Sequence, residues 1–219
     1  LKFMKRVTFY IDGFNFYFGI KRARKANPEW NKCYWIDLVK LCGLFLGEGQ
    51  ILNKVVYFTA SPLSPAKNSR QSSFLNANKL INGDKLEIVR GKYMEKSLDC
   101  PFCNATISRP EEKRTDVNIS VRMLVDCFED KTDTVVLISA DSDLIPPLEQ
   151  VNRLFPQKNI KVYFPPTNYS HDIKDILLQK RGRPVLMVNN LRKFIDSVMP
   201  DTVSDGTKTY TIPDKWKNF

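Results

Sequence analysis

The amino-acid sequence predicts a three-layer α/β/α domain with a central, mostly parallel sheet. Short apolar runs alternate along the chain with segments in which apolar residues recur at helical spacing. The best of the short runs, TVVLIS at 134–139, is apolar on consecutive residues, as is typical of a strand covered on both faces. The chain has 219 residues, 42% of them hydrophobic. This is long enough and apolar enough for one such domain with a full core and a small appendage.

The expected strands are short runs that end at turn-forming residues. The first run, RVTFYI, is rich in β-branched and aromatic residues and stops at Asp12-Gly13. The second is followed by Pro62 and Pro65, and the third comes after an Asn-Gly-Asp break. The strands are expected at residues 6–11, 51–59, 86–89, 134–139 and 160–164.

The segments between these strands have the apolar spacing of helices. In the segment 115–128, for example, Val117, Val121 and Leu124 mark one helical face. The helices are expected at residues 15–24, 36–46, 67–81, 115–128, 144–154, 170–178 and 191–198. Strands that alternate with helices imply a parallel sheet with helices on both faces.

Two segments are expected to lie outside this core, and the domain is assigned to residues 4–199. The insert at 91–112 is polar, contains Pro101 and Pro110 and has no sustained apolar period, so it should be an excursion from the core. The tail at 200–219 turns polar after Pro200 and is expected to be a loosely held terminus.

The charge balance predicts an anionic partner. The chain has 34 Lys and Arg residues against 24 Asp and Glu residues, a formal net charge of +10. Nucleic acid and anionic membrane surfaces are the usual partners of such proteins. No window approaches the roughly 18 unbroken apolar residues of a membrane span, and no secretory signal is evident. We expect a soluble cytoplasmic protein without a membrane partner, and the sequence leaves a homo-oligomer open.

Aspartates follow two of the predicted strands. Asp12 follows the first strand, and Asp141 and Asp143 follow the strand at 134–139. Asp116 lies in the first turn of a predicted helix. Because the carboxyl ends of parallel strands meet at one edge of a sheet, these four side chains are expected to converge there.

Converging carboxylates repel one another unless a cation compensates them, so the pattern predicts a metal site. Oxygen ligands without nearby Cys or His favour Mg²⁺ or Mn²⁺ over Zn²⁺. The chemistry most often served by such a site is phosphodiester hydrolysis. Taken singly, each aspartate also has a structural interpretation, as the start of a turn or as a helix cap.

Three segments resemble the signature blocks of the NYN domain family within the PIN-like nuclease superfamily. They are Tyr10-Ile11-Asp12-Gly13-Phe14-Asn15, Glu112-Lys113-Arg114-Thr115-Asp116-Val117-Asn118 and Ser139-Ala140-Asp141-Ser142-Asp143-Leu144. The resemblance covers roughly residues 4–178 and implies a Rossmann-like, PIN-like nuclease fold. It implies that Asp12, Asp116, Asp141 and Asp143 are the catalytic, metal-binding carboxylates, that Asn15 and Ser139 support them, and that the substrate is RNA in preference to DNA.

Two basic runs are candidates for phosphate contacts. The first is Lys21-Arg22-Ala23-Arg24-Lys25, and the second, Lys180, Arg181 and Arg183, follows the predicted helix at 170–178. Lys113 and Arg114 precede Asp116 and are further candidates. Most of the aromatic residues Phe14, Phe16, Tyr17 and Phe18 should be core, although one could stack on an unpaired base.

The cysteines predict reduced thiols. Cys33, Cys42 and Cys127 stand alone in helical or apolar surroundings, which suits core thiols. Cys100 and Cys103 supply half the ligands of a zinc site, and no further Cys or His is close in sequence. We expect a turn with reduced or redox-active cysteines there. The alternative is a zinc site completed by distant residues of the same chain or by a second chain. His171 is expected to be a surface or helix-start residue.

The function predicted from these features is that of a metal-dependent nuclease, specifically an endoribonuclease. The alternative is a non-catalytic PIN-like module that binds nucleic acid or protein. A third class, the haloacid-dehalogenase phosphohydrolases, also has Asp after the first strand. That class needs a second acid two residues later, where this chain has Phe14.

Overall fold

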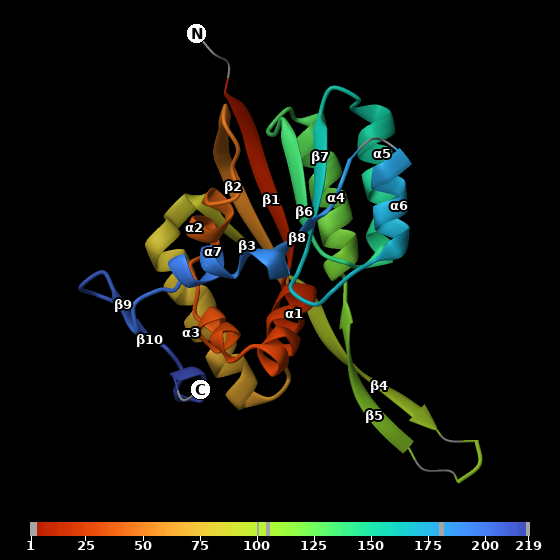
Figure 1. Cartoon of the computed structure of the whole chain (residues 1–219). Coiled ribbons are helices and arrows are strands. Elements are labelled where there is room, and N and C mark those ends of the chain that lie inside the picture. Colours follow the sequence, from red (N-terminus) through yellow and green to blue (C-terminus); the bar gives the residue numbers. More distant parts are fainter. Residues whose placement is uncertain (1–3, 100, 104–105, 180–181, 218–219) are drawn as a thin grey trace.

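The computed structural model describes residues 4–99, 101–103, 106–179 and 182–217. Among them, six strands form one parallel sheet in the order β3-β2-β1-β6-β7-β8 (Figure 1). Their bounds are β1 (Lys5–Asp12), β2 (Gln50–Thr59), β3 (Leu86–Arg90), β6 (Thr134–Ile138), β7 (Asn159–Phe164) and β8 (Val185–Leu186). The five expected strands are confirmed, and β8 is a short addition at the edge.

One face of the sheet packs against four helices from the first half of the chain and a fifth helix from near its end. These are α1 (Gly13–Ala26), the 3₁₀ helix η1 (Pro28–Tyr34), α2 (Leu38–Gly43), α3 (Pro65–Asn82) and α7 (Leu191–Asp196). Phe9 and Ile11 of β1 point into this layer, where they join Phe16 of α1 and Phe194 of α7 in one buried cluster. Asp37 caps α2, because its carboxylate accepts hydrogen bonds from the backbone N–H groups of residues 39 and 40.

The opposite face packs against α4 (Thr115–Phe128), α5 (Ile145–Leu154) and α6 (His171–Gln179). Tyr10, between Phe9 and Ile11 in β1, points to this side because side chains alternate along a strand. It lies in a second buried cluster with Ile119 of α4 and Leu148 of α5. The three-layer α/β/α fold is therefore confirmed. No helix of the described residues is long and apolar enough to cross a membrane.

The polar insert forms an antiparallel hairpin that projects from the body of the domain (Figure 1). It consists of β4 (Lys92–Asp99) and β5 (Thr106–Lys113). At its base, a Cβ atom on Gly91 would lie 2.6 Å from Oγ1 of Thr115, so only glycine fits. The insert therefore extends away from the sheet and its helices, in line with the expectation from its polarity.

The chain after Pro200 is not the loosely held tail expected from its polarity. It forms a small hairpin, β9 (Thr202–Ser204) and β10 (Thr209–Thr211), followed by the short helix α8 (Asp214–Lys217). Val203 is buried, and Trp216 packs against the core cluster on the α3 side of the sheet. Tyr210 and Ile212 also pack against this cluster. A composition average does not reveal these scattered apolar side chains in a polar segment.

Candidate metal centre

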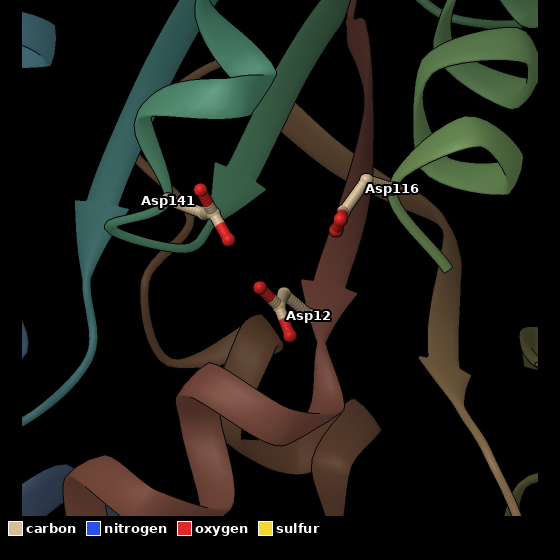
Figure 2. A group of neighbouring side chains, drawn as sticks. All are labelled: Asp12, Asp116 and Asp141. Carbon is tan, nitrogen blue, oxygen red and sulfur yellow. The ribbon is translucent and has the colours of Figure 1, made fainter. Parts of the chain in front are cut away.

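Three aspartates converge at one edge of the sheet (Figure 2). Asp12 is the last residue of β1, Asp116 is the second residue of α4, and Asp141 follows β6. One carboxylate oxygen from each lies within 4.8 Å of the others. The structure thus brings together three of the four aspartates expected from the sequence.

The strand register explains why Asp12 and Asp141 meet. β1 and β6 are parallel neighbours, and Ile11 pairs with Ile138, so both strands end at the same level. Directly after Asp12 the chain turns into α1, and a Cβ atom on Gly13 would lie 2.6 Å from the carbonyl oxygen of Phe58. Glycine is required there because the backbone of β2 passes so close.

The capping interpretation of these aspartates also holds. Asp12 caps α1, since its Oδ1 accepts a hydrogen bond from the backbone N–H of Asn15 at 3.0 Å. Asp141 caps the 3₁₀ helix η3 (Ser142–Leu144), since its Oδ1 accepts from the N–H of Asp143 at 3.0 Å. A carboxylate oxygen has two lone pairs, so a cap leaves acceptor capacity for a cation. Capping fixes the direction of both side chains.

Asn15 and Ser139, the expected supporting residues, both donate to Asp12. The Asn15 amide donates to Oδ2 at 2.8 Å, and the Ser139 hydroxyl donates to the same oxygen at 2.8 Å. Ser139 also accepts from the backbone N–H of Asp141 at 3.1 Å. Asn168 in turn donates to Oδ1 of Asn15 at 2.8 Å. These contacts fix the carboxylate of Asp12 before any cation binds.

The electrostatics of the site favour a bound cation. Burial raises the pKa of Asp12, and the charge of Asp141 adds to the effect. Desolvation raises the pKa of Asp116 to about 6, with further contributions from the charges of Asp141 and Asp12. Without compensation these groups resist ionisation together, and a divalent cation would relieve that repulsion.

The donor set fits a hard divalent cation. All three donors are carboxylate oxygens. Two oxygens bound to one ion lie no farther apart than twice the metal–oxygen distance, about 4.2 Å for Mg²⁺. Oxygens that lie within 4.8 Å of one another need only a small approach to bind the same ion. Oxygen-only coordination is the chemistry of Mg²⁺ and Mn²⁺.

Asp143, the fourth aspartate expected in the site, does not belong to this cluster. It is exposed, and its backbone N–H, not its carboxylate, contacts Asp141. Its charge still contributes to the raised pKa of Asp116, so it lies close to the site.

Glu112 is an acidic residue at the site that the sequence did not single out. It accepts a hydrogen bond from Oγ1 of Thr115 at 2.5 Å. Burial raises its pKa, and the charge of Asp12 contributes. Its place in the same sequence block as Asp116 was the available signal. The strand pairing of the hairpin, which the block alone does not reveal, directs it toward the aspartates.

The predicted basic residues are distributed over different parts of the surface. Lys21 and Arg24 of α1 line a pocket next to the acidic cluster, which also includes Gly13 and Glu112. Arg22 and Lys25 are exposed on the same helix, and Arg22 hydrogen-bonds to Asn168. All four basic side chains lie on α1, the helix that follows Asp12, and their phosphate contacts stay a prediction.

The remaining basic residues have different surroundings. Lys113 forms an ion pair with Glu111 at 2.7 Å, and Arg114 is exposed with a positive φ of 75° just before α4. Arg183 lines a separate cavity of about 810 Å³ with residues from α5, α6 and β7, and none of the three clustered aspartates lines it. Lys180 and Arg181 lie outside the described residues.

The buried cysteines are free thiols, as expected. Cys33, Cys42 and Cys127 are buried without a disulfide, and burial raises the pKa of each thiol. Cys103 is exposed and free in the hairpin loop. Cys100 lies outside the described residues, so the predicted proximity of this pair stays a prediction. His171 is exposed at the first residue of α6.

The fold and the acidic cluster together define a Rossmann-like α/β domain with a candidate metal site at the carboxyl ends of its strands. The NYN domain family matches residues 6–175, and the chain belongs to this family.

Among curated proteins, the chain is similar to 6-hydroxy-3-succinoylpyridine 3-monooxygenase HspA of Pseudomonas putida, with 23% identity over 181 residues. The match covers 67% of this chain and 55% of that protein, so the chain spans about half the length of this relative. Among solved structures, it is similar to VPA0982, a protein of unknown function from Vibrio parahaemolyticus, with a TM-score of 0.52 and 17% identity. That match covers 79% of this chain and 89% of the other, and it supports the fold.

Proposed function

We propose that the chain is a divalent-metal-dependent nuclease that hydrolyses phosphodiester bonds, acting as an endoribonuclease with RNA preferred over DNA. The observation that carries the proposal is the convergence of Asp12, Asp116 and Asp141 oxygens within 4.8 Å at the sheet edge. Membership of the NYN family supports a nuclease, and the net charge of +10 supports an anionic substrate.

In this proposal the three aspartates hold Mg²⁺ or Mn²⁺, and Asn15 and Ser139 keep Asp12 in place. The bound ion supplies Lewis-acid chemistry for the phosphate and the attacking water. Lys21 and Arg24, beside the acidic cluster, attract the nucleic-acid backbone toward an otherwise negative site. Cytoplasmic location is part of the same proposal, because cytoplasmic RNA would be the substrate.

A cleavage assay tests the proposal. Labelled single-stranded RNA and DNA of the same sequence are incubated with Mg²⁺ or Mn²⁺ and the wild type, Asp12→Asn or Asp84→Asn. Asp84 is the matched control, since it is exposed in the 3₁₀ helix η2 (Gly83–Lys85) before β3, at the opposite end of the strands. We expect RNA to be cut by the wild type and by Asp84→Asn, with activity lost in Asp12→Asn and in EDTA.

Three results would contradict parts of the proposal. Equal cleavage by wild type and Asp12→Asn would exclude the aspartate site as the source of activity. Tight RNA binding without cleavage in either metal would favour the alternative, a non-catalytic binding module. Faster cleavage of DNA than of RNA would overturn the substrate preference alone.

A second candidate function is action on a small aromatic compound. The name of the Pseudomonas relative describes the oxidation of a substituted pyridine. The observation that favours a related ligand here is the aromatic lining of the pocket beside the acidic cluster. Saturable binding of a pyridine carboxylate, without any binding of RNA, would support this candidate over the nuclease.

A further inference from the structure

The pocket beside the acidic cluster has an unusual concentration of aromatic rings. It has a volume of about 580 Å³ and lies between α1, η1, α3 and α8. Seven of its aromatic side chains form a continuous series of ring contacts with centroid separations of 4.5 to 6.3 Å. In order of contact they are Phe14, Phe18, Tyr17, Tyr34, Trp216, Phe74 and Tyr57.

The series of rings ends next to the candidate metal site. The hydroxyl of Tyr57 lies 3.5 Å from the carbonyl oxygen of Gly13, to which it donates, and Gly13 directly follows Asp12. Glu112, whose pKa the charge of Asp12 helps to raise, also lines the pocket. The pocket therefore lies next to the acidic cluster.

Not all of these rings are needed for the core. Tyr57 and Phe74 are buried, but Phe14 is 46% exposed and Tyr17 is 36% exposed. Both exposed rings lie on the pocket side of α1. An exposed aromatic ring costs hydration free energy, and a planar ligand that stacks on it would recover that cost.

A polar group in the pocket lacks a partner. Oε1 of Gln71 is buried without a hydrogen-bond donor among the described residues. The orientation of this amide is fixed, because its Nε2 donates to Oγ1 of Thr59 at 2.9 Å and to the carbonyl of Ala60 at 3.1 Å. Oε1 thus stays without a donor at the wall of the pocket.

The lining carries more positive than negative charge. The basic side chains of the pocket are Lys21, Arg24, Lys67, Arg70 and Lys215, against the acidic side chain of Glu112. Several cations around one aromatic pocket match a chain of phosphates better than they match a single small acid. This charge distribution favours nucleic acid over a free aromatic metabolite.

We propose that this pocket binds an unpaired base of a single-stranded nucleic acid, stacked on the aromatic rings, while the adjacent phosphate lies at the aspartates. The base accounts for the exposed rings, and the phosphates account for the cations. A base in a duplex cannot enter, because its faces are covered by its neighbours and its hydrogen-bonding edge is paired. The assignment deepens the proposed function by naming the substrate class, a single-stranded nucleic acid, and it rests on that function for the placement of the phosphate and for the choice of RNA.

A binding experiment separates stacking from phosphate contacts. The probes are a fluorescent single-stranded RNA hexamer and a hexamer of the same length with abasic riboses. Both are titrated with the full chain in EDTA, where cleavage is prevented. Without metal, the aspartates of the acidic cluster repel the phosphates of both probes, so this repulsion weakens the binding of both alike. We expect the wild type to bind the hexamer with bases about tenfold more tightly than the abasic one.

Variants locate the effect in the pocket. Tyr17→Ala and Phe14→Ala remove exposed rings on one helix, and each should reduce the preference for bases to about threefold or less. Phe128→Ala is the matched control, because Phe128 is 80% exposed at the end of α4 and does not line the pocket. This control should keep the wild-type preference. Thermal melting of each variant verifies that the domain is folded.

The outcomes distinguish this assignment from the nuclease proposal. Equal binding of both hexamers by the wild type would overturn the base pocket, even if RNA were cleaved. A preference that persists in both pocket variants would also overturn it, because the bases would then be bound elsewhere. A preference that depends on Tyr17 and Phe14 would support the pocket even if cleavage were absent, and only the nuclease proposal would then fail.

Discussion

The hydroxyl of Ser139, just after β6, donates to Oδ2 of Asp12 at the end of β1, at 2.8 Å. This bond connects two parallel strands at the edge where the acidic cluster lies, and Ser139 is fully buried. In the proposed function, this bond holds one carboxylate in position for a cation.

The first prediction is that Ser139→Ala weakens metal binding without unfolding the domain. The substitution removes a hydrogen bond that orients Asp12, and losing such a supporting contact weakens metal affinity by about tenfold or more. Isothermal titration with Mn²⁺ measures the change in affinity. Ser61→Ala is the control, because Ser61 lies two residues after the end of β2 and does not contact Asp12 in the described hydrogen bonds. An unchanged Mn²⁺ affinity would show that Asp12 does not depend on Ser139.

The second prediction concerns the pH dependence of stability in the absence of metal. An Asp in the unfolded chain titrates near pH 3.9, whereas the pKa of Asp116 in the folded protein is raised to about 6. Protonation therefore favours folding, and this contribution is present below about pH 4 and lost as the pH rises through about 6. Asp116→Asn should be more stable than the wild type at pH 7, with an advantage that shrinks toward pH 5.

Urea denaturation of both proteins in EDTA at several pH values measures this difference. Added Mg²⁺ at pH 7 should reverse it, because the wild type gains stability from the ion and the variant gains less. A difference in the free energy of unfolding that does not vary with pH would contradict the raised pKa.

The third prediction separates a structural carboxylate from those of the site. Asp126 is buried under the sheet, where it accepts from the hydroxyl of Tyr10 at 2.9 Å and from Nε of Arg122 at 2.9 Å. Asp126→Ala should lower the free energy of unfolding by about 3 kcal/mol, because it leaves Arg122 and Tyr10 without this partner. Mn²⁺ affinity at a temperature where the variant is folded should be unchanged. A large loss of affinity would mean that this network extends to the metal site.

The fourth prediction distinguishes the two basic regions. Lys21 lines the pocket beside the aspartates, whereas Arg183 lines the separate cavity by α5 and α6. Lys21→Ala should reduce the slope of log Kd against log salt concentration for single-stranded RNA by about 0.7, the value for one lost phosphate contact. Arg183→Ala should leave the slope unchanged. The opposite result would place the RNA across the other cavity.

The sequence predicted the parts of the fold that depend on local patterns. Apolar runs such as the one that ends at Asp12 define strands, and parallel strands place the residues after them at one edge, so the meeting of Asp12 and Asp141 could be predicted. The packing of Trp216 against Tyr34 could not, because it joins segments far apart in sequence without any periodic signal. The position of Glu112 depends on the hairpin pairing, and that of Asp143 depends on the 3₁₀ turn after Asp141.

The most direct test of the central claim is the rate of RNA cleavage as a function of Mn²⁺ concentration in the wild type and in Asp141→Asn. This substitution removes one ligand charge from the cluster with little change in volume. The account predicts saturable, metal-dependent cleavage by the wild type, and in the variant a rate lower by on the order of 100-fold together with weaker Mn²⁺ binding. Cleavage by Asp141→Asn at the wild-type rate and Mn²⁺ dependence would contradict it.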